Sequence, residues 1–231
     1  MTDAKNYSTS KKLYVWWHYH WKLLLIGLAA LILLAAVILS QFQQKKPDYQ
    51  IGLVSTEELP VDTAEALVEE LKAYCEDVNG DGQILIQLNQ YTVDFNAATE
   101  NTDAYSQMSG VIKLSSDLSP SDGSYIFLFD DAESFEETTR ALQYLDGSAP
   151  ESDEEEVQLE KMYLNWTDCP VLTALSLGDY KGYTLMDDQT GSSQDVMSRF
   201  MIGRHIVSEE ARTSTYAADE ALWQALTAGA Q

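Results

Sequence analysis

The most apolar stretch of the chain is residues 23–39, a run of seventeen residues that contains no charge and no polar stripe. A helix needs about 20 apolar residues to cross roughly 30 Å of hydrocarbon, and residues 40–42 complete that length. Aromatic side chains crowd residues 14–21, and amphipathic rings favour the headgroup layer of a bilayer. The pattern therefore predicts a transmembrane helix over residues 23–42.

Lysines are distributed unevenly on the two sides of this run. Four lie in a basic and aromatic head, residues 1–22, and two lie in a linker, residues 43–48. The positive-inside rule predicts a single-pass protein of the cell membrane, with its N-terminus in the cytoplasm and its body outside. A cleaved signal peptide is the alternative, but it has a shorter apolar core and an A-x-A cleavage pattern, which residues 37–41 lack.

Residues 49–231 alternate between strand-like and helix-like patterns. Short branched or apolar runs predict strands over residues 49–54, 83–91, 124–129, 171–177, 182–186 and 200–207. Apolar residues at helical spacing predict helices over residues 60–78, 103–118, 133–144 and 218–228. The first six elements alternate strand and helix, which predicts a single layered α/β domain with a mixed, partly parallel sheet. The near-continuous apolar run at 124–129 is typical of a central strand covered on both faces.

The clearest amphipathic pattern of the chain is that of residues 60–78. The helices predicted over residues 103–118 and 218–228 also have an apolar face. The residues expected to point inward are Tyr105, Met108, Val111, Ile112 and Leu114 in the first of them, and Leu222, Trp223 and Leu226 in the second. Between them lies a solvated acidic loop, residues 146–160, to which we assign no chemistry.

Charge divides the chain at the same place as hydropathy. Residues 1–47 carry six Lys and one Asp, a net charge of +5, whereas residues 48–231 carry eight Lys or Arg against 36 Asp or Glu, a net charge of −28. A body this acidic repels nucleic acid, so we expect no nucleic-acid partner. Such a charge keeps an exported domain soluble, and it attracts cations or a basic partner.

The body contains both cysteines of the chain, Cys75 and Cys169. Two cysteines in an exported domain suggest one disulfide. Two buried free thiols are the alternative, because unpaired cysteine is among the most buried residue types. The position of Cys75 on the apolar stripe of its helix favours that alternative slightly.

One segment has the spacing of metal ligands. Asp77, Asn79 and Asp81 precede a glycine in the pattern D-x-[DN]-x-[DN]-G, whose alternate oxygens can wrap a calcium ion. Over about a dozen residues this segment resembles the opening half of dockerin and EF-hand loops, although Leu85 and Leu88 stand where those loops have later ligands. The alternative is a helix C-cap followed by a turn. Calcium is the only cofactor that the sequence suggests.

Catalytic motifs are scarce. His205 is the only histidine of the body and lies in an apolar run, which indicates a strand histidine more than a member of a Ser-His-Asp triad. There is no G-x-S-x-G elbow and no phosphate-binding loop. Arg199 and Arg204 are expected to pair with surface carboxylates.

The layout of a short aromatic head, one span and an α/β body resembles uncharacterised single-pass membrane proteins of Gram-positive bacteria. The strand–helix succession is also distantly similar to the first lobe of extracytoplasmic solute-binding proteins. We therefore expect a membrane-anchored binding or accessory module that meets another envelope protein, such as a transporter subunit. The alternative is an extracytoplasmic hydrolase that uses carboxylates alone.

Overall fold

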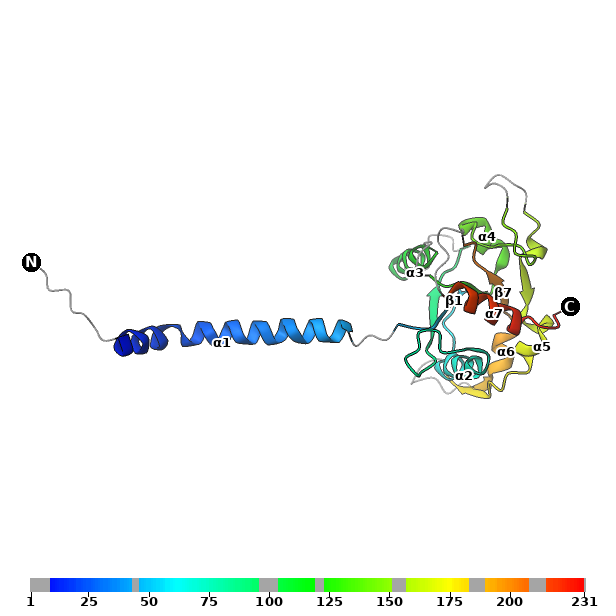
Figure 1. Cartoon of the computed structure of the whole chain (residues 1–231). Coiled ribbons are helices and arrows are strands. Elements are labelled where there is room, and N and C mark those ends of the chain that lie inside the picture. The colour runs from blue at the N-terminus through cyan, green and yellow to red at the C-terminus, as the bar shows by residue number, and fades with distance from the viewer. Residues whose placement is uncertain are drawn as a thin grey trace, which may run out of the picture. The chain divides into compact units, whose positions relative to one another are not determined.

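The structure is a computed structural model that describes residues 9–42, 46–95, 104–118, 123–150, 157–182, 190–207 and 215–230. The chain divides into two compact units, Met1–Lys46 and Pro47–Gln231 (Figure 1). The expectations for residues 151–156 of the acidic loop and for residues 183–186 lie outside the described residues.

The first unit contains one long helix, α1 (Thr9–Phe42). Within the described residues, its segment Trp16–Leu34 is the only helical stretch long and apolar enough to cross a membrane. Its apolar side chains, Leu31 and Leu33 among them, are exposed in the unit itself. The structure thus confirms a long apolar helix near the N-terminus.

The second unit is built on a five-stranded sheet with the order β2-β1-β3-β7-β4. The strands are β1 (Tyr49–Ser55), β2 (Ile86–Thr92), β3 (Ile126–Phe129), β4 (Tyr163–Asn165) and β7 (Met201–Arg204). Strand β1 is parallel to β2 and β3, whereas β7 is antiparallel to β3 and β4. The predicted mixed, partly parallel sheet is confirmed, with β3 at its centre. A second, two-stranded sheet pairs β5 (Asp179–Lys181) with β6 (Thr190–Ser192).

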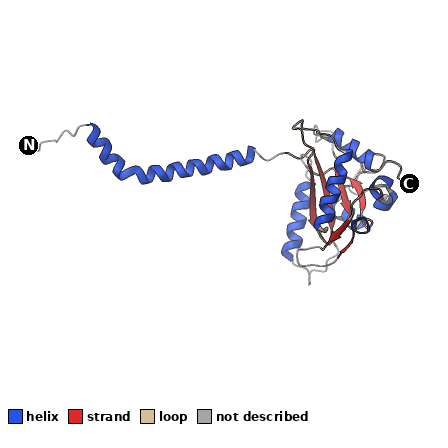
Figure 2. Cartoon of the chain, turned by 90° about the horizontal axis from the view of Figure 1, so that it is seen from below, coloured by secondary structure: helices blue, strands red, loops and turns tan. Residues whose placement is uncertain are grey.

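Helices cover both faces of the large sheet (Figure 2). They are α2 (Val61–Leu71), α3 (Ala104–Asp117), α4 (Ala132–Thr139), α5 (Pro170–Thr173), α6 (Ser193–Met197) and α7 (Tyr216–Leu226), with short 3₁₀ turns at Lys72–Tyr74, Leu159–Lys161 and Trp166–Asp168. One core includes side chains of α2, α5 and α7, and the other includes side chains of α3 and α4. Leu222, Trp223 and Leu226 are buried in the first core, as predicted.

Two glycines in the sheet make room for aromatic rings of the second core. Gly52 in β1 and Gly203 in β7 both lie beside Phe127 of β3. A Cβ atom on Gly52 would lie 2.3 Å from the Phe127 ring, and one on Gly203 would lie 3.0 Å from the Phe129 ring. The ring of Phe135 stacks on Phe129 with centroids 5.1 Å apart. The centre of the sheet is therefore closed by rings packed directly on backbone.

Several of the predicted elements differ from the observed ones. The helix predicted over residues 133–144 ends as α4 at Thr139, because Arg140 adopts a left-handed conformation. The helix predicted over residues 60–78 ends with α2 and one 3₁₀ turn, because the next main-chain N–H groups bond elsewhere. Glu76 N donates to the Tyr49 hydroxyl at 3.1 Å, and Val78 N donates to the Asp48 carboxylate at 3.0 Å. The strand predicted over residues 171–177 is wrong: Pro170 begins the short helix α5 instead, and proline favours the first turn of a helix.

The inner face of α3 also differs from the prediction. Met108, Val111 and Ile112 are exposed, whereas Leu114 is buried. The reason is Gly110, on the stripe that meets the sheet, where a Cβ atom would lie 2.4 Å from the Thr92 carbonyl oxygen. The helix approaches the end of β2 through its smallest residue, which turns the larger apolar side chains outward. The side chain of Tyr105 lies outside the described part.

Candidate functional site

The segment predicted to bind calcium forms a loop held by its own carboxylates. Asp77 Oδ1 accepts hydrogen bonds from Gly80 N at 2.7 Å and Asp81 N at 3.2 Å, and Asp77 Oδ2 accepts one from Gly82 N at 2.7 Å. Asn79 Oδ1 accepts one from Asp81 N at 2.9 Å. Both glycines have positive φ, as tight turns require. Among the described residues no three His, Cys, Asp or Glu side chains are grouped to hold a metal, and calcium stays a prediction.

Asp48 fixes this loop to the start of the sheet. Its side chain is 2% exposed. Its Oδ1 accepts hydrogen bonds from Val78 N and Asn79 N, both at 3.0 Å, and its Oδ2 accepts one from Leu85 N at 2.8 Å. Asp48 was predicted to belong to the linker over residues 43–48, whereas it organises the connection from α2 to β2.

Cys75 and Cys169 are both buried in the first core as free thiols. Burial raises the pKa of Cys75 to about 12 and that of Cys169 to about 11. Because the thiolate is the reactive form, both groups are chemically quiet in the folded domain. The disulfide stays a prediction that thiol labelling can decide.

His205 lies at the end of β7 and is buried, as a strand histidine should be. Its main-chain N–H donates to the Tyr125 carbonyl at 2.8 Å, and its ring meets the edge of Phe127 at 6.1 Å between centroids. Burial lowers the pKa of the imidazole, and the negative charge of Asp117 opposes that shift.

The two arginines have different environments. Arg199 is a surface residue 3.8 Å from Glu57, as predicted. For Arg204 the prediction is wrong, because its side chain is only 5% exposed and its Nη1 donates to both carboxylate oxygens of Glu220 at 2.9 Å. Its Nη2 donates to the carbonyl oxygens of Tyr144 and Leu145. The pair ties α7 to strand β7 of the sheet.

The usual ligand position of an open α/β sheet is the crevice at the carboxyl ends of the strands, where the strand order reverses. Here that position lies between β1 and β3. Asp130, directly after β3, accepts hydrogen bonds at its Oδ2 from Thr56 N at 3.1 Å and from the Thr56 hydroxyl at 3.4 Å. The Asp130 carboxylate and the Thr56 side chain are therefore hydrogen-bonded to each other in this crevice.

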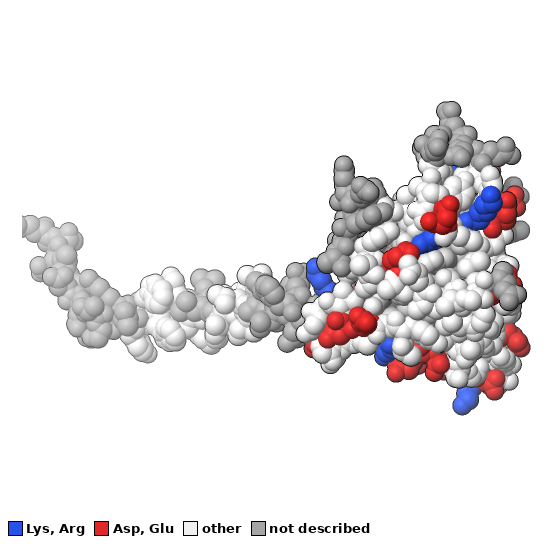
Figure 3. All heavy atoms as spheres, turned by 45° about the vertical axis from the view of Figure 1, so that its right-hand side comes forward, with Lys and Arg blue, Asp and Glu red and all other residues white. Residues whose placement is uncertain are grey.

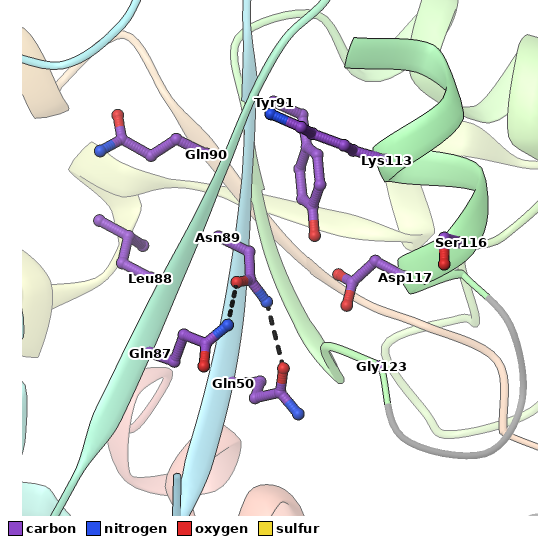
Figure 4. Close-up of a pocket in the computed structure, with 10 residues that line it drawn as sticks. All are labelled: Gln50, Gln87, Leu88, Asn89, Gln90, Tyr91, Lys113, Ser116, Asp117 and Gly123. Carbon is purple, nitrogen blue, oxygen red and sulfur yellow. Dashed lines mark hydrogen bonds between the residues drawn. The ribbon is translucent and has the colours of Figure 1, made fainter. Parts of the chain in front are cut away.

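A hollow of about 690 Å³ lies beside strand β2 and the C-terminal half of α3 (Figure 4). It is open to solvent, and most of the side chains that line it are polar. The residues around it are Gln50, Gln87, Leu88, Asn89, Gln90, Tyr91, Lys113, Ser116, Asp117 and Gly123. We refer to this set of residues as the β2 groove.

Side-chain amides form the floor of the β2 groove. Gln87 Nε2 donates to Asn89 Oδ1 at 2.6 Å. Asn89 Nδ2 donates to Gln50 Oε1 at 3.3 Å (Figure 4), and it also donates to the Ser124 hydroxyl at 3.2 Å. The mutual hydrogen bonds orient the amides, so the groove presents a fixed row of donors and acceptors without net charge.

One wall of the groove is formed by Asp117, at the end of α3. Its Oδ1 accepts a hydrogen bond from Ser124 N at 3.1 Å, whereas its buried Oδ2 has no partner among the described atoms. The Tyr91 hydroxyl points toward this carboxylate (Figure 4). Burial raises the pKa of Tyr91, and the charge of Asp117 raises it further. Tyr91 therefore remains a neutral hydrogen-bond donor at physiological pH.

Charge in the groove is limited to two groups from one helix, Lys113 and Asp117. Lys113 is exposed and forms no ion pair within the part of the chain that the structure describes. Glycoside hydrolysis by carboxylates requires two of them about 5–10 Å apart, and Asp117 is the only carboxylate among the lining residues. The arrangement suits the binding of a polar ligand better than acid–base chemistry.

Sequence reasoning did not find the β2 groove. The available signal was the alternation of polar residues along β2, where Gln87 and Asn89 share one face. The predicted strand over residues 83–91 contained this signal, but nothing in the local sequence showed that Lys113 and Asp117 of α3 would face this strand.

Comparisons with protein families, with characterised proteins and with solved structures find no match for the chain. The fold defines a mixed-sheet α/β domain preceded by one apolar helix.

Proposed function

We propose that the protein is a membrane-anchored binding or accessory module whose α/β domain lies outside the cell and holds another envelope protein through the β2 groove. The observation that carries the proposal is this groove, a solvent-open hollow of about 690 Å³ with an uncharged amide floor and one carboxylate. Such a site supplies hydrogen bonds and shape, which a binding module needs. It lacks the second carboxylate that the alternative, a carboxylate-dependent hydrolase, requires.

The anchor would be the apolar part of α1. Its length and composition support a membrane span, and four lysines before the span against two after it support an N-terminus in the cytoplasm. On the face shown in Figure 3, acidic side chains lie in several separate groups and basic ones are few. This distribution favours a soluble domain held beside a membrane without contact with anionic headgroups.

The partner would be a protein of the same envelope, such as a transporter subunit. A tether confines the domain to the membrane surface, where the effective concentration of neighbouring membrane proteins is high. A weak groove contact is then sufficient for association.

Two measurements test the proposal on the full chain in intact cells. A membrane-impermeant thiol reagent should label a cysteine introduced at exposed Glu65 in the body, and should not label one introduced at Thr2 before lysis. Crosslinking in native membranes followed by purification should then recover a second protein. Labelling of the body only after lysis, or recovery of this chain alone, would contradict the proposal.

A further inference from the structure

Strand β2 is an edge strand with one free side. It pairs with β1 along all seven residues, from Tyr49↔Ile86 to Ser55↔Thr92. No other strand of the described chain pairs with its outer side. The opposite edge of the sheet is β4, which has only three residues. A long unpaired edge presents a row of main-chain donors and acceptors to which another strand can add.

The composition of β2 lacks the features that usually protect such an edge. Proteins discourage pairing at an edge with charged side chains, proline or very short strands. Strand β2 reads IQLNQYT and contains neither charge nor proline. It lies in a body where 36 of 184 residues are acidic, so an uncharged edge of seven residues departs from its surroundings. The edge is therefore open to pairing in both geometry and chemistry.

The β2 groove surrounds this edge. Its lining includes Gln87, Asn89 and Tyr91 from one face of the strand and Leu88 and Gln90 from the other. Strand residues alternate between faces, so a hollow that touches both sets passes along the edge itself. An added strand would lie with its main chain against β2 and its side chains beside these five residues.

We propose that the outer edge of β2 pairs with an extended segment of a partner protein, a segment that contains no acidic residues. This inference rests on the proposed function and specifies how the module would hold its partner. Main-chain hydrogen bonds supply affinity in this mode, and flanking side chains supply specificity. The amides of Gln50, Gln87 and Asn89 in the groove floor would contact polar side chains of the added segment.

The net charge of the body restricts which partner segment can bind at the β2 edge. The body carries a net charge of −28, so it repels an acidic segment and attracts a neutral or basic one. A second copy of this chain is disfavoured for the same reason, because two bodies of −28 would have to meet edge to edge. The partner is therefore a different protein with a neutral or basic extended segment.

The first experiment locates the contact. A photo-crosslinking amino acid replaces Gln87 in the full chain, and a control chain carries it at Glu65, an exposed position on α2. After irradiation of native membranes, the partner segment joined to position 87 is identified by mass spectrometry. The inference expects an adduct with a neutral or basic extended segment at position 87. An adduct with another envelope protein at position 65 alone leaves an anchored binding module standing, but it overturns the β2 groove as the binding site and the inference with it. A homodimer at position 87 overturns the inference. No adduct at either position overturns both.

The second experiment tests main-chain pairing. A synthetic peptide of the crosslinked segment is bound to the full chain in detergent, next to the same peptide N-methylated at alternate residues. Loss of two strand hydrogen bonds should weaken binding about tenfold or more. Gln87→Lys, which places a charge on the edge, should weaken binding by a similar factor, whereas Gln158→Lys, an exposed control with the same change, should not. Equal binding of both peptides, or equal effects of both variants, overturns the inference.

Discussion

Asp48→Asn tests how much a single buried carboxylate contributes to this domain. The asparagine keeps one oxygen, which can still accept from Val78 N and Asn79 N, but an NH₂ group replaces the oxygen that accepts from Leu85 N at 2.8 Å. A donor then faces a donor in a side chain only 2% exposed. An unsatisfied buried N–H costs about 1–3 kcal/mol, and two bonds that lose their charge assistance add about 1 kcal/mol.

The expected loss is therefore about 2–4 kcal/mol of unfolding free energy. For a domain of this size each kcal/mol lowers Tm by about 2–4 °C, so Asp48→Asn should lower Tm by roughly 4–16 °C. The assay is thermal unfolding of the full chain in mild detergent, followed by near-ultraviolet circular dichroism. Glu65→Gln, the same chemical change on an exposed helix face, should leave Tm within about 1 °C. Equal Tm values for Asp48→Asn and its parent would refute the assignment of Asp48 as the anchor of the loop.

Three further predictions use the same assay or simple labelling. If the predicted calcium loop binds at roughly 10⁻⁴–10⁻³ M, about 10 mM calcium should raise Tm by several degrees, an effect that Asp81→Ala removes; an unchanged Tm would leave the loop as a turn. Alkylation of the denatured, unreduced chain should modify both Cys75 and Cys169, as the free thiols of the structure imply; labelling only after reduction would establish the disulfide. Burial raises the pKa of Asp219 to about 7, above its unfolded value of about 3.9. The contribution of this carboxyl to the unfolding free energy is therefore fully present below about pH 4 and is lost as the pH rises to about 7. The loss is at most about 4 kcal/mol, and solvent screening of the partly exposed side chain makes it smaller. Asp219→Asn should flatten the dependence of Tm on pH between 4 and 8, and an unchanged slope would contradict the shift.

The elements with a strong, local hydrophobic signal were predictable from the sequence. Strands β1 and β3 and helix α7 fall within a few residues of the prediction, because in each case one pattern decides both the element and its buried face. The failures come from contacts that no local pattern encodes. Gly110 determines which face of α3 meets the sheet, and Pro170 converts an apolar alternation into a helix.

The candidate site was less predictable than the fold, because its residues come together only through the sheet register. Gln50 and Gln87 are 37 positions apart in the sequence and become neighbours through parallel pairing. Asp117 then reaches the same groove from a helix. The buried pairing of Arg204 with Glu220 is of the same kind: an arginine in an apolar strand is visible in the sequence, whereas its partner on another element is not.

The ion pair between Arg204 and Glu220 also sets a time order for folding. Strand β7 lies between β3 and β4 in the sheet, and the carboxylate that neutralises its arginine comes from α7, the last helix of the chain. A polypeptide is made from its N-terminus, so the position beside β3 stays open until β7 and then α7 have been synthesised. Until Glu220 arrives, insertion of β7 would bury an uncompensated charge, which costs several kcal/mol. The domain should therefore complete its sheet only after α7 has been synthesised, and a chain truncated before α7 should not reach the native state.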